Sequence, residues 1–229
     1  MKINKSKKEY IGARAKLYEV RRKNRRVWRE EQKIILKFLR EISQINNKNI
    51  KILDIPVGTG RFFEFYKKLN FLVTGIDISK DMLKEAEKKN KLLKLNAKLK
   101  KGDIINIKIQ NKSMDLVLCI RILNLLNFNN FSKALNELVR VSDKYIICGI
   151  MICPSLKNEP VLRCINILLR RIFSNFFSLI KGDRETIRHS ENQVLSQFKK
   201  RSLVIYDKAR IDTGRGGYAY YIYCLKKEK

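Results

Sequence analysis

Residues 51–61 read Lys-Ile-Leu-Asp-Ile-Pro-Val-Gly-Thr-Gly-Arg, and this stretch decides the fold. Its first half is a short apolar run with β-branched members, and its second half is a turn rich in Pro and Gly. Residues 61–70 continue with a helical pattern, so the order strand, tight turn, helix is predicted. Gly58 and Gly60 lack a Cβ atom, and the turn can therefore adopt positive φ and hold a ligand against bare backbone at the helix N-terminus.

The residues around this turn indicate which of two ligands it suits, a dinucleotide or S-adenosylmethionine. The dinucleotide fingerprint G-x-G-x-x-G needs a third glycine, but counting from Gly58 that position holds Phe63. Asp54 ends the strand. A carboxylate there suits a ligand that carries positive charge and amine donors, whereas it would repel a pyrophosphate. S-adenosylmethionine, a sulfonium with an α-amino group, fits that description.

The stretch resembles the first motif of the class I S-adenosylmethionine-dependent methyltransferases, D-x-G-x-G-x-G. Asp54, Gly58 and Gly60 match this motif, and Pro56 stands where the family has its first glycine. Proline is compatible with a negative φ and needs no N–H at that position. The resemblance therefore implies a methyltransferase with S-adenosylmethionine as its cofactor.

Three further pieces of the family pattern follow in the same order. Asp77 closes residues 71–77, near the offset of about 20 residues at which a βαβ unit presents a carboxylate to ribose hydroxyls. The resemblance places Asp103 beside the adenine amino group, and residues 114–120 read as a buried fourth strand. It implies cofactor contacts from Asp54, Pro56, Gly58, Gly60, Asp77, Ile78, Asp103, Ile104 and Cys119.

The implied fold class is α/β: a Rossmann-like seven-stranded class I sheet with helices on both faces and an antiparallel C-terminal hairpin. The hairpin is expected from residues 204–211 and 218–225. We expect a single domain over residues 1–229. Its parts are an N-terminal helical segment (1–49), a cofactor-binding core (50–152), a lid or substrate insertion (153–190), and a closing helix and hairpin (191–229).

The predicted helices carry further expectations. Residues 10–20 and 28–45 have helical spacing, and Tyr18 or Trp28 either covers the cofactor or packs in the core. Ser190 is predicted to cap the helix that follows it, with Gln193 at the capping-box position. Residues 161–180 present a wide apolar face, which a lid, a dimer contact or a membrane surface would cover.

The amino-acid composition limits which partners and which cellular compartment are expected. With 51 Lys and Arg against 22 Asp and Glu the formal charge is +29, which favours nucleic acid or an anionic membrane surface, although the lysines are spread along the whole chain. We see neither a spanning apolar run nor a signal-peptide pattern, so the cytoplasm is expected. Five cysteines without a C-x-x-C pair and one histidine give no metal pattern, and reduced, buried thiols are predicted.

Candidate catalytic residues lie outside the cofactor motifs. His189, the single histidine, is a candidate general base for a hydroxyl acceptor, with a packing role as the alternative. Arg121, together with Arg184 or Arg188, could hold an anionic acceptor. The end of the fourth strand lacks the N/D-P-P-Y/F signature of amino-base methylation and the Pro-Cys nucleophile of cytosine C5 enzymes.

The sequence therefore predicts methyl transfer to a small molecule, with an oxygen acceptor favoured and a saccharide or lipid-linked substrate as a hypothesis. An RNA methyltransferase, or a methyltransferase-like binding subunit without turnover, is the alternative. Peripheral membrane contact stays open.

Overall fold

A computed structural model describes residues 10, 12–45, 49–153, 165, 168–169, 189–213 and 218–228. The helices named in that part of the chain are α2 (Ala13–Lys16), α3 (Arg26–Ile45), α4 (Phe63–Lys68), α5 (Lys80–Leu93), the 3-10 turn η1 (Leu123–Leu125), α6 (Phe128–Val141) and α8 (Glu191–Lys199). The strands are β1 (Lys51–Asp54), β2 (Leu72–Asp77), β3 (Lys98–Lys101), β4 (Met114–Cys119), β5 (Ser142–Cys153), β6 (His189–Ser190), β7 (Leu203–Asp212) and β8 (Ala219–Lys227).

The strands form one mixed sheet. Seven of them lie in the order β3-β2-β1-β4-β5-β8-β7, and the short β6 pairs with β5. Strands β1 to β5 are parallel, whereas β8 is antiparallel to both β5 and β7. This confirms the predicted sheet and its C-terminal hairpin, while β6 was not predicted. The order reverses between β1 and β4, and α/β sheets bind ligands at the carboxyl ends of strands at such a switch point.

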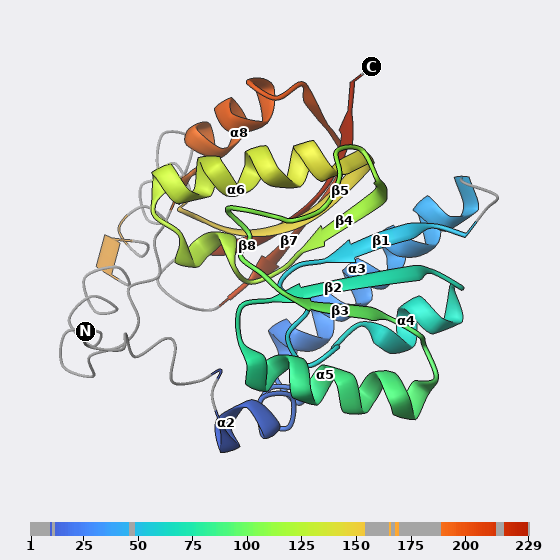
Figure 1. Cartoon of the computed structure of the whole chain (residues 1–229). Coiled ribbons are helices and arrows are strands. Elements are labelled where there is room, and N and C mark those ends of the chain that lie inside the picture. The colour runs from blue at the N-terminus through green and yellow to red at the C-terminus, as the bar shows by residue number, and fades with distance from the viewer. Residues whose placement is uncertain are drawn as a thin grey trace.

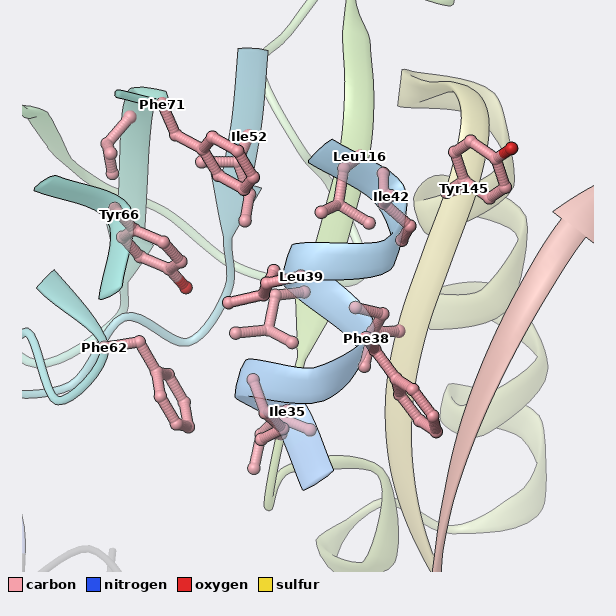
Figure 2. Packing of buried hydrophobic residues seen from close by; sticks show 14 of the residues in the cluster. Ile35, Phe38, Leu39, Ile42, Ile52, Phe62, Tyr66, Phe71, Leu116 and Tyr145 are labelled. Atoms are coloured by element: carbon pink, nitrogen blue, oxygen red, sulfur yellow. The ribbon is translucent and has the colours of Figure 1, made fainter. Parts of the chain in front are cut away.

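Helices cover both faces of the sheet (Figure 1). One face packs against α3, α4 and α5, and the other against α6 and α8. Figure 2 shows Ile35, Phe38, Leu39 and Ile42 of α3 lying over the central strands. These four side chains are buried, because α3 carries its apolar residues on one stripe.

Pairing between the central strands explains why both faces are apolar. Ile52 of β1 pairs with Leu116 of β4, and both belong to the core on the α3 side. The next pair, Leu53 and Val117, belongs to the core on the α6 side. Successive side chains of a strand point to opposite faces, so a strand covered on both sides reads as a continuous apolar run.

Serine side chains cap two of the described helices, and the cap at Ser190 confirms a prediction. The Ser79 hydroxyl accepts a hydrogen bond from the Met82 N–H at the start of α5. Ser190 and Gln193 form the reciprocal capping box at the start of α8. Both caps fix the direction in which the helix leaves the preceding strand.

The prediction of a helix over residues 10–20 is wrong in its length, because the helix found there is much shorter. Helix α2 ends at Lys16, and Leu17 and Val20, which were expected on its apolar face, are 43% and 59% exposed. Residues 17–24 form turns instead, in which Glu19 is held by the distant Thr59 and Lys89. Tertiary contacts thus override the local periodicity.

Several predictions fall outside the described residues. These are most of the 153–190 lid with Cys164, Arg184 and Arg188, and most of the apolar face predicted over residues 161–180. Of the predicted thiols, Cys119, Cys148 and Cys224 are free and buried. The helices in the described part of the chain fall short of the length and hydrophobicity that crossing a membrane requires.

Candidate functional site

The turn after β1 is built on two residues with left-handed backbone. Gly58 has φ +57° and Gly60 has φ +75°. A Cβ on Gly60 would lie 2.5 Å from Cε2 of Phe63, so only glycine fits there. The Val57 N–H donates to the Ile76 carbonyl at 2.9 Å, which ties the turn to the end of β2. The predicted strand, turn and helix are confirmed, and the turn lies beside the second acidic motif.

Asp77 is held at the carboxyl end of β2 by backbone donors. Its Oδ2 accepts from the Gly58 N–H at 2.9 Å, and its Oδ1 accepts from the Ser79 N–H at 2.8 Å. Burial raises the pKa of this carboxyl, although the backbone hydrogen bonds oppose that shift. The carboxylate is therefore oriented by the turns on both sides of it and has lone pairs left for a ligand.

Asp54, the first acidic residue of the motif, is buried more deeply. The Tyr66 hydroxyl donates to its Oδ2 at 2.9 Å. Burial raises the pKa of Asp54 to about 8, with the Tyr66 hydrogen bond acting in the opposite direction. Asp54 does not line the cavity described below, so it would act on a ligand only through space and only when ionised.

A cavity of about 120 Å³ opens at the carboxyl ends of β1, β2 and β4. Its lining comes from four parts of the chain: the N-terminal segment, the turn after β1, the end of β2 with the start of α5, and the end of β4. The residues are Tyr10, Tyr18, Trp28, Pro56, Val57, Gly58, Thr59, Arg61, Phe62, Asp77, Ile78, Ser79, Met82, Ile120, Arg121 and Ile122.

The N-terminal segment closes one side of this cavity. The Ser79 hydroxyl donates to the Tyr10 carbonyl at 2.5 Å, and the Gly12 N–H donates to Asp81 Oδ2 at 2.9 Å. The Tyr18 ring packs edge-on against Trp28, with their centroids 6.1 Å apart. Both rings line the cavity, and Trp28 is also buried in the core, so the structure is compatible with both sequence-based interpretations.

The structure brings some of the predicted cofactor residues to the cavity and leaves others apart. Those that line it are Pro56, Gly58, Asp77 and Ile78. Those that do not are Asp54, Gly60, Asp103, Ile104 and Cys119. In this last group the Asp103 carboxylate accepts from the Ile105 N–H at 3.2 Å, and Cys119 is fully buried inside β4.

The two catalytic candidates lie in different surroundings. Arg121 follows β4 with φ +65° and lines the cavity, where Glu31 of α3 pairs with it. His189 is 2% exposed, and its ring centroid lies 4.3 Å from that of Phe131. Burial lowers the pKa of His189, and its Nε2 is 3.4 Å from the Leu123 carbonyl. His189 is not among the residues that line the cavity.

Sequence reasoning missed Glu31 and the role of Arg61. Arg61 directly follows the glycine turn, and its guanidinium donates to the carboxylate of Glu31 and to the Trp28 carbonyl. Glu31 is fully buried on the apolar stripe of α3, between Trp28 and Ile35. An acidic residue at helical spacing within such a stripe is the signal that could have found it.

Comparisons with known proteins agree with this geometry. Residues 52–144 match the family model described as a methyltransferase domain. An uncharacterised protein of Methanocaldococcus jannaschii is 33% identical over 96 residues, which make up 42% of this chain and 37% of that protein. The chain thus matches well under half the length of this curated relative.

Solved structures share the fold at low sequence identity. Magnesium protoporphyrin IX methyltransferase from Synechocystis, crystallised with S-adenosylhomocysteine, has a TM-score of 0.64 at 18% identity, over 87% of this chain and 83% of that chain. An S-adenosylmethionine-dependent methyltransferase from Clostridium acetobutylicum has a TM-score of 0.62 at 18% identity, over 85% and 91%. Residues 52–144 thus match a methyltransferase domain, and the chain shares the fold of these two methyltransferases.

The residues at the cavity fit the cofactor of this class. Gly58 gives a ligand close access to backbone, and the Asp77 carboxylate is oriented to accept from hydroxyl groups. Arg61, whose side chain is 8% exposed, lines the same cavity and has a buried Nε–H with no acceptor among the described residues. A ligand with a diol at one end and an anionic group at the other would match Asp77 and Arg61, respectively.

Proposed function

We propose that this chain transfers a methyl group from S-adenosylmethionine to a small-molecule acceptor. The observation that carries the proposal is the Asp77 carboxylate, fixed by the Gly58 and Ser79 N–H groups at the wall of the cavity. A carboxylate in this position after the second strand suits ribose hydroxyls. The match of residues 52–144 to a methyltransferase domain supports the same assignment.

The residues of the chain would act mainly by binding and alignment. The bound cofactor supplies a methyl group already activated on a sulfonium, so no residue has to activate it. Asp77 would accept from the ribose hydroxyls, and Gly58 would let the cofactor lie against the turn. Tyr10, Tyr18 and Trp28 cover the cavity on the N-terminal side and would exclude water, which favours an in-line displacement.

We propose that the methyl acceptor is an oxygen atom of a saccharide or of a lipid-linked molecule. The exposed apolar side chains of Leu17 and Val20, on the N-terminal segment that contributes to the cavity, support an amphiphilic acceptor. His189 remains the candidate base; burial lowers its pKa, which keeps the imidazole neutral at pH 7 but makes it a weaker base than an exposed histidine. Its contact with Leu123 also fits a role in packing the 3-10 turn η1.

Calorimetric titration with S-adenosylmethionine and S-adenosylhomocysteine, at low and at moderate salt, tests the cofactor part of the proposal. We expect binding in the wild type and a loss of about tenfold or more in Asp77→Ala, because charged hydrogen bonds to the ribose disappear. Absence of binding at both salt concentrations would refute it.

A screen of acceptors with labelled methyl then tests the chemistry. Label on amphiphilic hydroxyl compounds supports the proposal. Label on RNA, with affinity that falls steeply with salt, would replace the small-molecule acceptor by the alternative that the charge of +29 suggests. Tight cofactor binding without transfer to any acceptor would favour a binding subunit.

A further inference from the structure

Two arginines share one buried carboxylate at the wall of the cavity. Glu31, fully buried in α3, accepts from Arg61 Nη1 through Oε1. The same Oε1 accepts from Arg121 Nε at 3.1 Å, and Oε2 lies 2.5 Å from Arg121 Nη2. Three segments, α3, the turn after β1 and the end of β4, therefore meet in one ion-pair cluster.

This cluster is not electrically balanced. Two guanidinium groups face a single carboxylate, which leaves one positive charge in a site of low exposure. Burial lowers the pKa of Arg61, and the charge of Arg121 acts in the same direction. A second anionic group would relieve this repulsion, since buried charges are stable when they are paired and hydrogen-bonded.

The cluster also has donors that the described residues do not use. The Arg61 Nε–H is buried without an acceptor in the described part of the chain, although Nη1 and Nη2 of the same group are bonded. Arg121 directs Nε and Nη2 to Glu31, and its side chain remains 33% exposed. Both arginines line the cavity. An anionic acceptor with two oxygens matches this arrangement, because it can take one charge-assisted hydrogen bond from each guanidinium.

We propose that Arg61 and Arg121, held in place by Glu31, form a carboxylate-binding subsite that takes the α-carboxylate of the cofactor's amino-acid end. The inference rests on the proposed function, since it divides the cavity between Asp77 for the ribose and the arginine pair for the carboxylate.

Glu31 is the positioning residue of this subsite. Its two oxygens orient the guanidinium groups, and the Trp28 ring lies under Arg61 with 3.4 Å between the ring centroid and Cζ. Trp28 and Glu31 both belong to α3. Helix α3 therefore sets the geometry of a site whose other members follow β1 and β4.

The test compares two ligands that differ in the carboxylate alone, S-adenosylmethionine and decarboxylated S-adenosylmethionine, by calorimetry. We expect the wild type to prefer the first by about tenfold to a hundredfold, which is the effect of charge-assisted hydrogen bonds. Arg121→Gln should reduce this preference to about twofold or less without weakening the binding of the decarboxylated ligand, whose positive charges gain nothing from the guanidinium. Arg121→Lys, which keeps the charge but not the fork, should lie between them.

Two more variants separate positioning from general stability. Glu31→Gln should also lower the preference while it leaves binding of the decarboxylated ligand intact, which a purely structural role would not do. Arg201→Gln is the matched control. Arg201 is an arginine bonded to Asn136, Gln197 and Ser132 between α6 and α8, away from the cavity lining, and its loss should not change the preference.

Equal affinities of the wild type for the two ligands, or a preference that Arg121→Gln and Arg61→Gln both retain, would overturn the subsite while the proposed function stands. Failure of the wild type to bind either ligand would refute the proposed function itself.

Discussion

Replacing Asp54 with Asn should stabilise the protein in the absence of cofactor. Asp54 is a carboxyl group that the fold buries at the end of β1 with the Tyr66 hydroxyl as its side-chain donor. Burial raises its pKa from 3.8 to about 8. At neutral pH the residue is therefore ionised in the unfolded chain and protonated in the folded one. Asn has the same shape and an acceptor for Tyr66, but it needs no proton.

The magnitude follows from the interval between the unfolded pKa and the pH of the solution. At pH 7 this interval is about 3 pH units, and at about 1.4 kcal/mol for each unit the buried carboxyl reduces the free energy of unfolding by roughly 4 kcal/mol. Because the folded-state pKa is the higher one, the contribution to stability is full below about pH 4 and is lost as the pH rises towards 8. The gain in Asp54→Asn should grow over the same window.

Urea unfolding of both proteins at several pH values between 5 and 8, without cofactor, measures this gain. Tyr66→Phe is a companion variant, which removes the donor and should destabilise the fold at every pH. An advantage of Asp54→Asn that stays constant with pH, or a variant less stable than the wild type at pH 8, would refute the reasoning. The same variant should bind S-adenosylmethionine more weakly, because the positive sulfonium favours an ionised carboxyl nearby.

Three further predictions concern the turn, the histidine and a helix cap. Gly60→Ala should lower the free energy of unfolding by about 2 kcal/mol or more, because the new side chain combines φ +75° with a clash against Phe63. Gly58→Ala should cost about 1 kcal/mol, since the nearest contact of its Cβ is the end of the flexible Met82 side chain at 3.5 Å. Urea unfolding of the two variants compares these costs. Because the folded-state pKa of His189 is lowered, the wild type loses stability as the pH falls below about 6.5, and His189→Phe should lose less between pH 7 and 5 in thermal unfolding. Ser190→Ala, which removes the hydroxyl that accepts from the Gln193 N–H in the capping box, should cost about 1 kcal/mol, and an unchanged urea midpoint would contradict the cap.

The sheet could be predicted from sequence because its signals are local and agree with one another. The apolar runs of β1, β4 and β5 report burial on both faces, and the two glycines of the turn fix where β1 ends. Asp77 could be placed as well, since its distance from Asp54 reflects one βαβ unit. These features need no knowledge of contacts between distant segments.

The N-terminal wall of the cavity could not be predicted in the same way. The spacing of Leu17 and Val20 suggested a longer helix, yet the chain there follows contacts made across long sequence separations, such as Thr59 with Glu19. The acid at position 31 was overlooked because apolar periodicity alone was used to interpret α3. A polar residue on a buried stripe carries more information than the apolar residues around it, because burial of an unpaired charge is costly.

Backbone conformation at the carboxyl edge of the sheet links the cluster around Glu31 to function. Gly58, Gly60 and Arg121 all have positive φ and all lie at this edge. The two glycines adopt that conformation freely, but for Arg121 it costs on the order of 1 kcal/mol. The ion pair with Glu31 can offset this cost, since a buried and well-oriented pair is worth more than an exposed one. A glycine at position 121 would adopt this backbone conformation without the cost. An arginine held there by a buried ion pair is therefore expected when the position of its guanidinium matters for binding.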